Sequence, residues 1–137
     1  MFDLTGRNAL VTGATGGLGQ AIARALHAQG ATGALSGTRE NVLQDLAAEL
    51  GTRTHVLPCN LSDAEAVDAL PKQAAEAMGS MDILIANAGI TRDKTLGNMP
   101  EHFWDMTIAV NLTAEELIDE ELMRRELLRE NGRIVCI

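Results

Sequence analysis

The stretch Thr12-Gly13-Ala14-Thr15-Gly16-Gly17-Leu18-Gly19 decides the fold because of its position in the chain. It follows a short apolar run at about residues 8–12 and precedes a longer segment, at about residues 18–29, that suits a helix. Glycines at such a turn let the backbone approach a pyrophosphate, and the helix N-terminus offers free N–H groups and a positive dipole. The stretch therefore predicts a phosphate-binding turn. A glycine-rich turn without a ligand is the plainer alternative.

Outside this turn, short apolar runs alternate with longer segments rich in Ala, Leu, Glu and Gln, a pattern typical of repeated strand–helix–strand units. Such units form a parallel sheet covered by helices. With right-handed crossovers, the first two helices cover one face and the last two cover the other. The expected fold is α/β: a three-layer, Rossmann-like half with a five-stranded parallel sheet of order 3-2-1-4-5 and helices on both faces. We expect the strands at about residues 8–12, 32–36, 54–59, 83–87 and 133–137.

The first two helices have clear ends. Residues 18–29 stop at Gly30, and residues 40–50 stop at Gly51, because glycine readily adopts the left-handed conformation that ends a helix.

The last two helices are less regular in sequence. The third opens with a capping box in which Ser62 and Glu65 bond each other's backbone N–H groups, and Pro71 predicts a kink or break within it. The fourth begins near Pro100 and extends to about residue 129. Residues 113–116 could instead cap a separate helix.

Composition restricts the classes of function. A chain of 137 residues suits a single domain, so residues 1–137 are taken as one dinucleotide-binding unit. The net charge of −8 argues against nucleic acid and anionic membrane as partners. No apolar run approaches a membrane span, and residues 1–8 lack the pattern of a secretory signal. The two cysteines, Cys59 and Cys136, have no metal-ligand spacing and are expected to be reduced in a cytoplasmic protein.

The glycine stretch resembles the T-G-x-x-x-G-x-G pattern of the short-chain dehydrogenase/reductase family, which Thr12, Gly13, Gly17 and Gly19 match. Residues 85–89, Ile-Ala-Asn-Ala-Gly, are similar to the N-N-A-G segment of that family, with Ala in place of its first Asn. These two matches favour a ligand-binding turn over an empty one.

Two shorter matches extend the resemblance. Asn60-Leu61 is similar to the D-L pair that the family places beside the adenine, and Val110-Asn111 is similar to the segment whose Asn holds a water in the proton relay. The resemblance covers residues 1 to about 113 and resumes at residues 132–135. For Asn87 and Asn111, backbone bonding between neighbouring elements is an equally simple interpretation.

Within the family, residues 88–93 and 109–113 are most similar to bacterial 3-oxoacyl-[acyl-carrier-protein] reductases. That resemblance implies a β-keto thioester as substrate, NADPH as reductant and a role in fatty acid synthesis.

Charge at the end of the second strand predicts the cofactor. An acidic residue there accepts hydrogen bonds from the ribose of NAD, whereas a cation pairs with the 2′-phosphate of NADP. Residues 36–39 are Ser-Gly-Thr-Arg, with no acid before Glu40. We therefore expect NADP(H), with Arg39 on the phosphate and the Ser36 or Thr38 hydroxyl assisting. The alternative for Arg39 is a solvated residue at the start of a helix. The expected cofactor-binding residues are Gly13, Thr15, Gly16, Gly17, Leu18, Gly19, Ser36, Thr38, Arg39, Asn60, Leu61, Asn87, Ala88 and Gly89.

The chain departs from the family in its catalytic residues. The family has a Ser just beyond the fifth strand, then a Tyr and a Lys four residues apart. None is matched here, and the sequence contains no tyrosine. Asn111 is the one matched member of that catalytic tetrad, a remnant only. The chain is thus expected to be the first half of a reductase, cut off before the substrate half and inactive alone.

Other features favour an alternative class. Residues 115–130 are crowded with charge where the family helix packs against partner subunits, and Gly33 is a poor strand residue. The chain could therefore be an engineered minimal α/β scaffold that folds or self-assembles without using its nucleotide site. A third interpretation is a fragment that completes an active site with a second chain. The fifth strand, as a bare edge, predicts self-association.

Overall fold

The computed structural model describes residues 2–137 and contains one parallel sheet in the order β3-β2-β1-β4-β5. This confirms the predicted architecture. The central strand, Asn8–Val11, is buried along its whole length and pairs with a strand on each side. The strands are β1 (Asn8–Val11), β2 (Thr32–Gly37), β3 (Thr54–Pro58), β4 (Met81–Ala86) and β5 (Leu128–Cys136).

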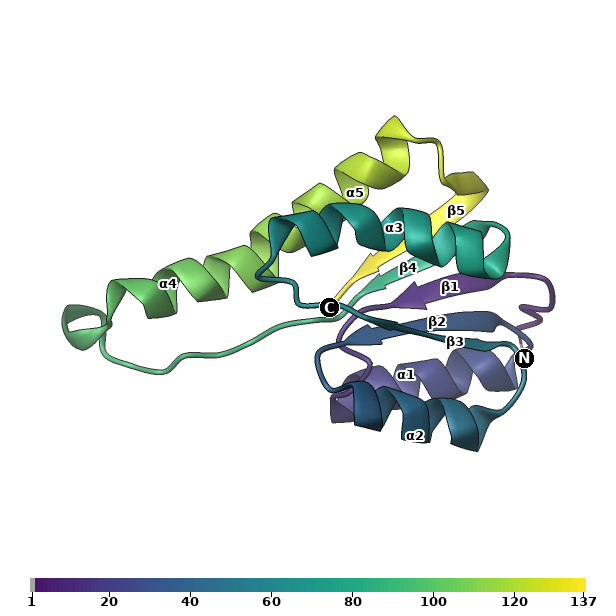
Figure 1. Cartoon of the computed structure of the whole chain (residues 1–137), viewed down its shortest axis with the longest axis horizontal. Helices are drawn as coiled ribbons and strands as arrows, with labels where there is room; N and C mark the ends of the chain where they lie inside the picture. Colours follow the sequence, from purple (N-terminus) through teal and green to yellow (C-terminus); the bar gives the residue numbers. More distant parts are fainter. Residues whose placement is uncertain (1) are drawn as a thin grey trace.

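Helices cover both faces of this sheet, as Figure 1 shows: α1 (Gly17–Ala28) and α2 (Glu40–Leu50) lie on one face, and α3 (Ala64–Met78) and α5 (Ala114–Arg124) lie on the other. The remaining helix, α4 (Glu101–Ile108), extends away from the sheet. Alternate residues of β1 point to opposite layers: Val11 packs with Leu43 of α2, and Leu10 packs in the cluster that holds Leu70 of α3 and Ile118 of α5. Each layer thus has its own core. No helix within residues 2–137 has the length and apolar character needed to cross a membrane.

The start of α3 differs from the predicted capping box. Asp63 is the N-cap, and its carboxylate accepts the N–H groups of Glu65 and Ala66 at 3.1 and 3.4 Å. Ser62 instead donates its hydroxyl to Asn60 Oδ1 at 2.8 Å, because it lies one residue before the cap. The predicted break at Pro71 is also absent. The helix continues through this proline, which is fully buried.

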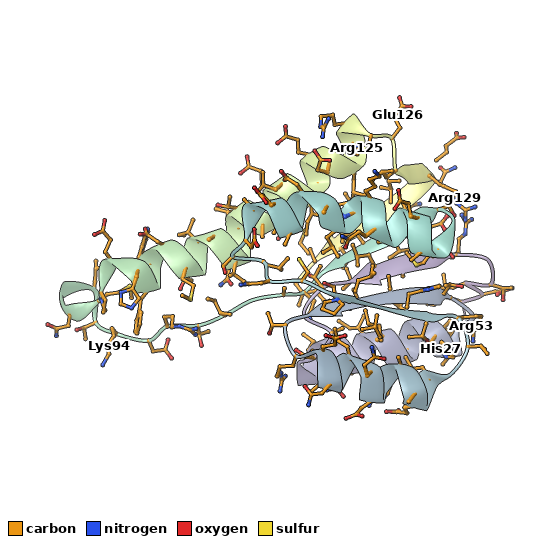
Figure 2. All side chains as sticks on the ribbon, viewed as in Figure 1. His27, Arg53, Lys94, Arg125, Glu126 and Arg129 are labelled. Carbon is orange, nitrogen blue, oxygen red and sulfur yellow. The ribbon has the colours of Figure 1, made fainter. Side chains whose placement is uncertain are left out.

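Residues 101–124 form one continuous helical arm, as the first of the two alternatives predicted, and no separate helix is capped at residues 113–116. Residues Ala109–Thr113 form a wider π-helical turn that joins α4 to α5, and Thr113 has helical dihedrals (φ −63°, ψ −40°) without capping. The arm ends at Arg124, earlier than predicted. Glu126 then adopts φ +52°, which reverses the chain, and β5 begins five residues before the predicted start. Figure 2 shows Glu126 at this reversal.

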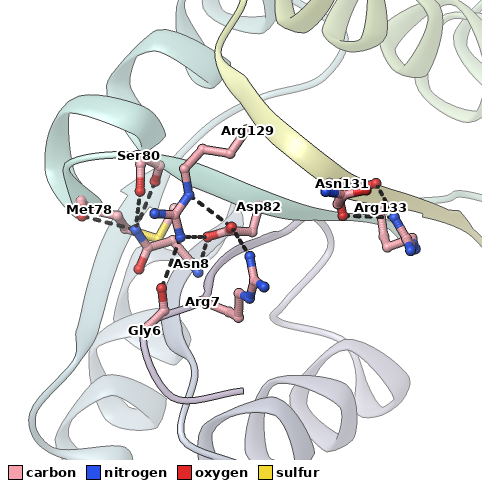
Figure 3. A network of polar contacts seen from close by, with 10 residues as sticks. Gly6, Arg7, Asn8, Met78, Ser80, Asp82, Arg129, Asn131 and Arg133 are labelled. Carbon is pink, nitrogen blue, oxygen red and sulfur yellow. Dashed lines mark hydrogen bonds and ion pairs between the residues drawn. The ribbon is translucent and has the colours of Figure 1, made fainter. Parts of the chain in front are cut away.

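A buried carboxylate ties three strands together at the amino end of the sheet (Figure 3). Asp82 accepts hydrogen bonds from Arg7 at 3.0 Å, from the Asn8 N–H at 2.9 Å, and from Arg129 at 2.6 and 2.9 Å. Arg129 also donates to the Gly6 carbonyl at 3.0 Å. These contacts join the starts of β1, β4 and β5 and fix their relative positions.

Candidate active site

A cleft of about 700 Å³ opens at the carboxyl ends of the strands. The strand order reverses here, because β1 lies between β2 and β4, and ligands of open α/β sheets bind at such a point. All the residues that the sequence assigned to a cofactor lie in its lining. The lining consists of Gly13, Thr15, Gly16, Gly17, Leu18, Gly19, Ser36, Gly37, Thr38, Arg39, Cys59, Asn60, Leu61, Ser62, Asn87, Ala88, Gly89, Ile90, Arg92, Met106 and Val110.

Two glycines of the turn are required by the protein itself. Gly13 has φ +63°, and a Cβ atom there would lie 2.8 Å from the Ala88 Cα. A Cβ atom on Gly19 would overlap the Gly13 carbonyl oxygen. These glycines therefore let β1, α1 and the loop after β4 approach one another closely.

The other two glycines are not explained by packing. A Cβ on Gly16 would meet only the Gly13 oxygen, at 3.6 Å, and one on Gly17 would meet nothing within 4 Å. Gly16 caps α1 without a side-chain hydrogen bond, and the first turn contains no acidic residue. The first N–H groups of a helix have no partner within it, so this end presents free donors and a positive dipole to the cleft. The turn fits an anion such as a pyrophosphate.

The loop after β4 is tied to the glycine turn. The Thr12 hydroxyl accepts the N–H groups of Asn87 and Ala88, both at 3.1 Å. The Asn87 amide donates to the carbonyls of Thr12 and Gly13 at 3.0 and 3.3 Å. Asn87 thus bonds the backbones of neighbouring elements, which was the alternative to a role in binding, and it also lines the cleft.

The charge of the cleft is opposite to that of the whole chain. Its lining contains Arg39 and Arg92 and, among the described residues, no Asp or Glu, although the net charge of the protein is −8. Arg39 donates to the Thr15 carbonyl at 2.6 Å, which holds its guanidinium over the glycine turn. Burial, with a smaller effect of Asp63, raises the pKa of the Cys59 thiol to about 11, so this lining residue is neutral.

Asn111 lies in the π-helical turn, behind the cleft lining. Its Oδ1 accepts the Ile90 N–H at 2.8 Å and its Nδ2 donates to the Ile90 carbonyl at 2.9 Å. The side chain thus fixes the loop after β4 through the backbone. A part for Asn111 in a proton relay stays a prediction.

Seven lining residues were missed by the sequence reasoning: Gly37, Cys59, Ser62, Ile90, Arg92, Met106 and Val110. Gly37 had a signal, because it is a glycine within the predicted strand-end segment, and a Cβ there would lie 2.8 Å from Thr15 Cγ2. Met106 had none, because it reaches the cleft only through the path of the arm. Val110 was named only as part of the segment similar to the family, beside Asn111, and not as a lining residue.

Known proteins resemble this chain over its whole length. The family model for short chain dehydrogenase matches residues 7–137. Nodulation protein G of Rhizobium sp. (strain N33) is 50% identical over 137 residues, which are all of this chain and 56% of that protein. The 3-oxoacyl-[acyl-carrier-protein] reductase FabG of Rickettsia conorii is 38% identical, over all of this chain and 55% of its own length. The chain therefore spans about half the length of these relatives.

Solved structures of short chain dehydrogenases likewise match nearly all of this chain with about half of their own length. A short chain dehydrogenase from Burkholderia cenocepacia in complex with NADP superposes with a TM-score of 0.91 and 36% identity, covering 97% of this chain and 55% of that one. A 3-ketoacyl-(acyl-carrier-protein) reductase from Brucella melitensis complexed with NADH has a TM-score of 0.83 and 27% identity, over 89% and 50% of the two chains.

Proposed function

This chain belongs to the short-chain dehydrogenase family, and we propose on that basis that residues 1–137 form one nucleotide-binding domain whose cleft holds NADP(H). The proposed parent activity is reduction of a 3-oxoacyl thioester, as the name of the Rickettsia conorii relative describes for that protein. The observation that carries the proposal is the cleft itself, an acid-free site with free helix N–H groups in an acidic protein.

Each part of the lining has a proposed role. The N–H groups at the start of α1 bind the pyrophosphate, and Gly16 and Gly17 leave room for it. Arg39 pairs with the 2′-phosphate, with the Ser36 and Thr38 hydroxyls nearby. Asn60 and Leu61 lie beside the adenine.

The loop after β4 supports the other half of the nucleotide. The residues that do so are Asn87, Ala88 and Gly89, and Asn111 holds this loop by its two bonds to Ile90. NADPH, when bound, supplies a hydride. The chain's own residues bind and orient.

A titration with NADPH and NADH tests this function. Arg39→Gln is the variant, and Arg133→Gln is the control, because Arg133 is also a carbonyl-bonded arginine but lies outside the cleft lining. We expect NADPH to bind about ten- to a hundredfold more tightly than NADH, the range of a charged hydrogen bond. Arg39→Gln should abolish this preference, and Arg133→Gln should keep it.

Equal affinities in the unmodified chain, or a preference that survives Arg39→Gln, would remove Arg39 from its proposed role. If neither nucleotide binds at millimolar concentration while circular dichroism shows a folded protein, the scaffold interpretation is correct instead.

A further inference from the structure

Arg92 is a cation of the cleft to which the nucleotide proposal gives no role. The proposed positions of the pyrophosphate, the 2′-phosphate, the adenine and the other half of the nucleotide are assigned to the glycine turn and to residues up to Gly89. Arg92 lies three residues beyond Gly89, on the long loop that leads from β4 to α4 (Figure 1).

The Arg92 guanidinium is weakly held. One N–H donates to the carbonyl of the adjacent Thr91 at 2.8 Å, and another approaches the Met106 sulfur at 3.6 Å. Thioether sulfur is a poor acceptor, and a guanidinium has five N–H donors, so most of its bonding capacity is free. Across residues 2–137, the ion pairs within 4 Å do not include Arg92.

Apolar side chains line the cleft that holds Arg92. They include Ile90 from the loop and Met106 and Val110 from the helical arm, and Met106 contacts the Arg92 guanidinium. Ile90 is fixed by its two hydrogen bonds to Asn111, so this wall has a defined place beside the cation. A guanidinium next to aliphatic side chains matches a molecule that carries both a negative charge and an alkyl chain.

We propose that Arg92, with Ile90, Met106 and Val110, forms a subsite for an organic anion with an aliphatic chain, carboxylate or phosphate ester, which binds beside the nucleotide. The inference builds on the proposed function, because the nucleotide is assigned the rest of the cleft. Arg92 recognises the anionic group, and the wall from the arm contacts the alkyl chain.

The test uses the 137-residue chain saturated with NADP⁺ and three probes: hexanoate, hexyl phosphate and hexanol. Binding is followed by NMR of the Met106 methyl group, assigned with Met106→Leu. We expect the two anions to shift this signal and hexanol to bind at least tenfold more weakly. Arg92→Gln should weaken anion binding about ten- to a hundredfold, and Arg133→Gln should leave it unchanged. A response to only one of the two anions identifies which charged group the subsite takes.

Hexanol binding as tightly as hexanoate, or anion binding unaffected by Arg92→Gln, would overturn the proposal. It would also be wrong if Arg92→Gln weakened NADP⁺ binding as much as Arg39→Gln, because Arg92 would then belong to the nucleotide site. The anion titrations are repeated without nucleotide. If NADP⁺ does not bind but the anions still bind through Arg92, the nucleotide function fails and the subsite stands.

Discussion

Gly13 and Gly17 belong to one turn but are needed for different reasons. Gly13 has a positive φ and no room for a Cβ, whereas Gly17 has open space in front of it. We expect Gly13→Ala to lower the free energy of unfolding by about 2–4 kcal/mol, from backbone strain and overpacking. Gly17→Ala should leave it within about 1 kcal/mol of its original value but weaken NADPH binding, because the methyl group enters the phosphate position.

Urea unfolding and nucleotide titration of the two variants separate these effects. If Gly17→Ala binds NADPH as tightly as the unmodified chain, the turn does not hold the pyrophosphate as proposed.

Asp82 makes stability depend on pH. Burial raises the pKa of its carboxyl, but the hydrogen bonds from Arg129, the Asn8 N–H and Arg7 outweigh burial, so the pKa is lowered. A folded pKa below the unfolded value of about 3.9 means that the carboxylate stabilises the fold above that pH. This contribution is lost as pH falls through the folded pKa.

We therefore expect the free energy of unfolding to decrease when the pH is lowered below about 4. In Asp82→Asn, the part of this decrease that comes from protonation of Asp82 should be absent. At neutral pH, Asp82→Asn should cost about 2–4 kcal/mol, because two arginines lose a buried partner. The measurement is urea unfolding across a pH series, with Asp45→Asn on the exposed side of α2 as control. An Asp82→Asn curve parallel to the unmodified one would exclude this linkage.

At the scale of elements, the sequence predicted correctly those helices and strands whose limits follow from local sequence patterns. The strands, their order and the first two helices follow from apolar runs and glycine stops. The limits of the last helix and of β5 depend on contacts distant in sequence, such as Arg129 with Asp82. The π-helical turn holds Asn111, whose side chain bonds to Ile90, a contact that is likewise distant in sequence. The position of the proposed cofactor residues in the cleft lining follows from the strand ends in the same way, whereas the wall from the arm was not predicted.

The outer edge of β5 carries backbone groups that no other strand of the described sheet pairs with, and it predicts self-association of the chain. β5 pairs only with β4 in the described sheet, and Ile137 donates its N–H to Ala86 at 3.1 Å. By the alternation of a strand, the Ile134 and Cys136 N–H groups point outward, and exposed edges of this kind recruit other strands. We expect the 137-residue chain to associate as its concentration rises, with slower hydrogen exchange at these two amides.

Sedimentation velocity across a wide concentration range measures the association. Val135→Lys, a charge placed on the edge strand, should reduce it. A monomer at every concentration, with unchanged exchange of the Ile134 and Cys136 amides, would contradict the prediction.

At the scale of the whole molecule, charge is divided between surface and cleft. The chain carries a net charge of −8, yet its cleft presents two arginines and the positive end of α1. An anion is therefore attracted locally by a protein that repels it at long range, and local geometry must supply the affinity. This division explains how an acidic chain can present a cleft that suits an anionic nucleotide.

Reduction in the same cleft would need a proton donor. Its lining, as far as the structure describes it, contains no Tyr, Lys, His, Asp or Glu, and the Cys59 thiol has a pKa of about 11 and is buried. Reduction of a ketone needs a carbonyl held in place and a donor for the forming alkoxide, and a positioned general acid alone contributes about 10²–10⁴ in rate. Asn111, whose amide is bonded to Ile90, is no substitute.

We expect the 137-residue chain to oxidise NADPH with a 3-oxoacyl thioester no faster than the uncatalysed rate. The measurement is the decrease of NADPH absorbance with and without the thioester, at protein concentrations that saturate the nucleotide site. Gly17→Asp is the control for any activity found, because a side chain at position 17 has open space and its carboxylate at the start of α1 should repel the phosphates and abolish nucleotide binding. Oxidation that depends on the thioester, survives repurification and disappears in Gly17→Asp would show that this chain carries a catalytic group outside those that line its cleft.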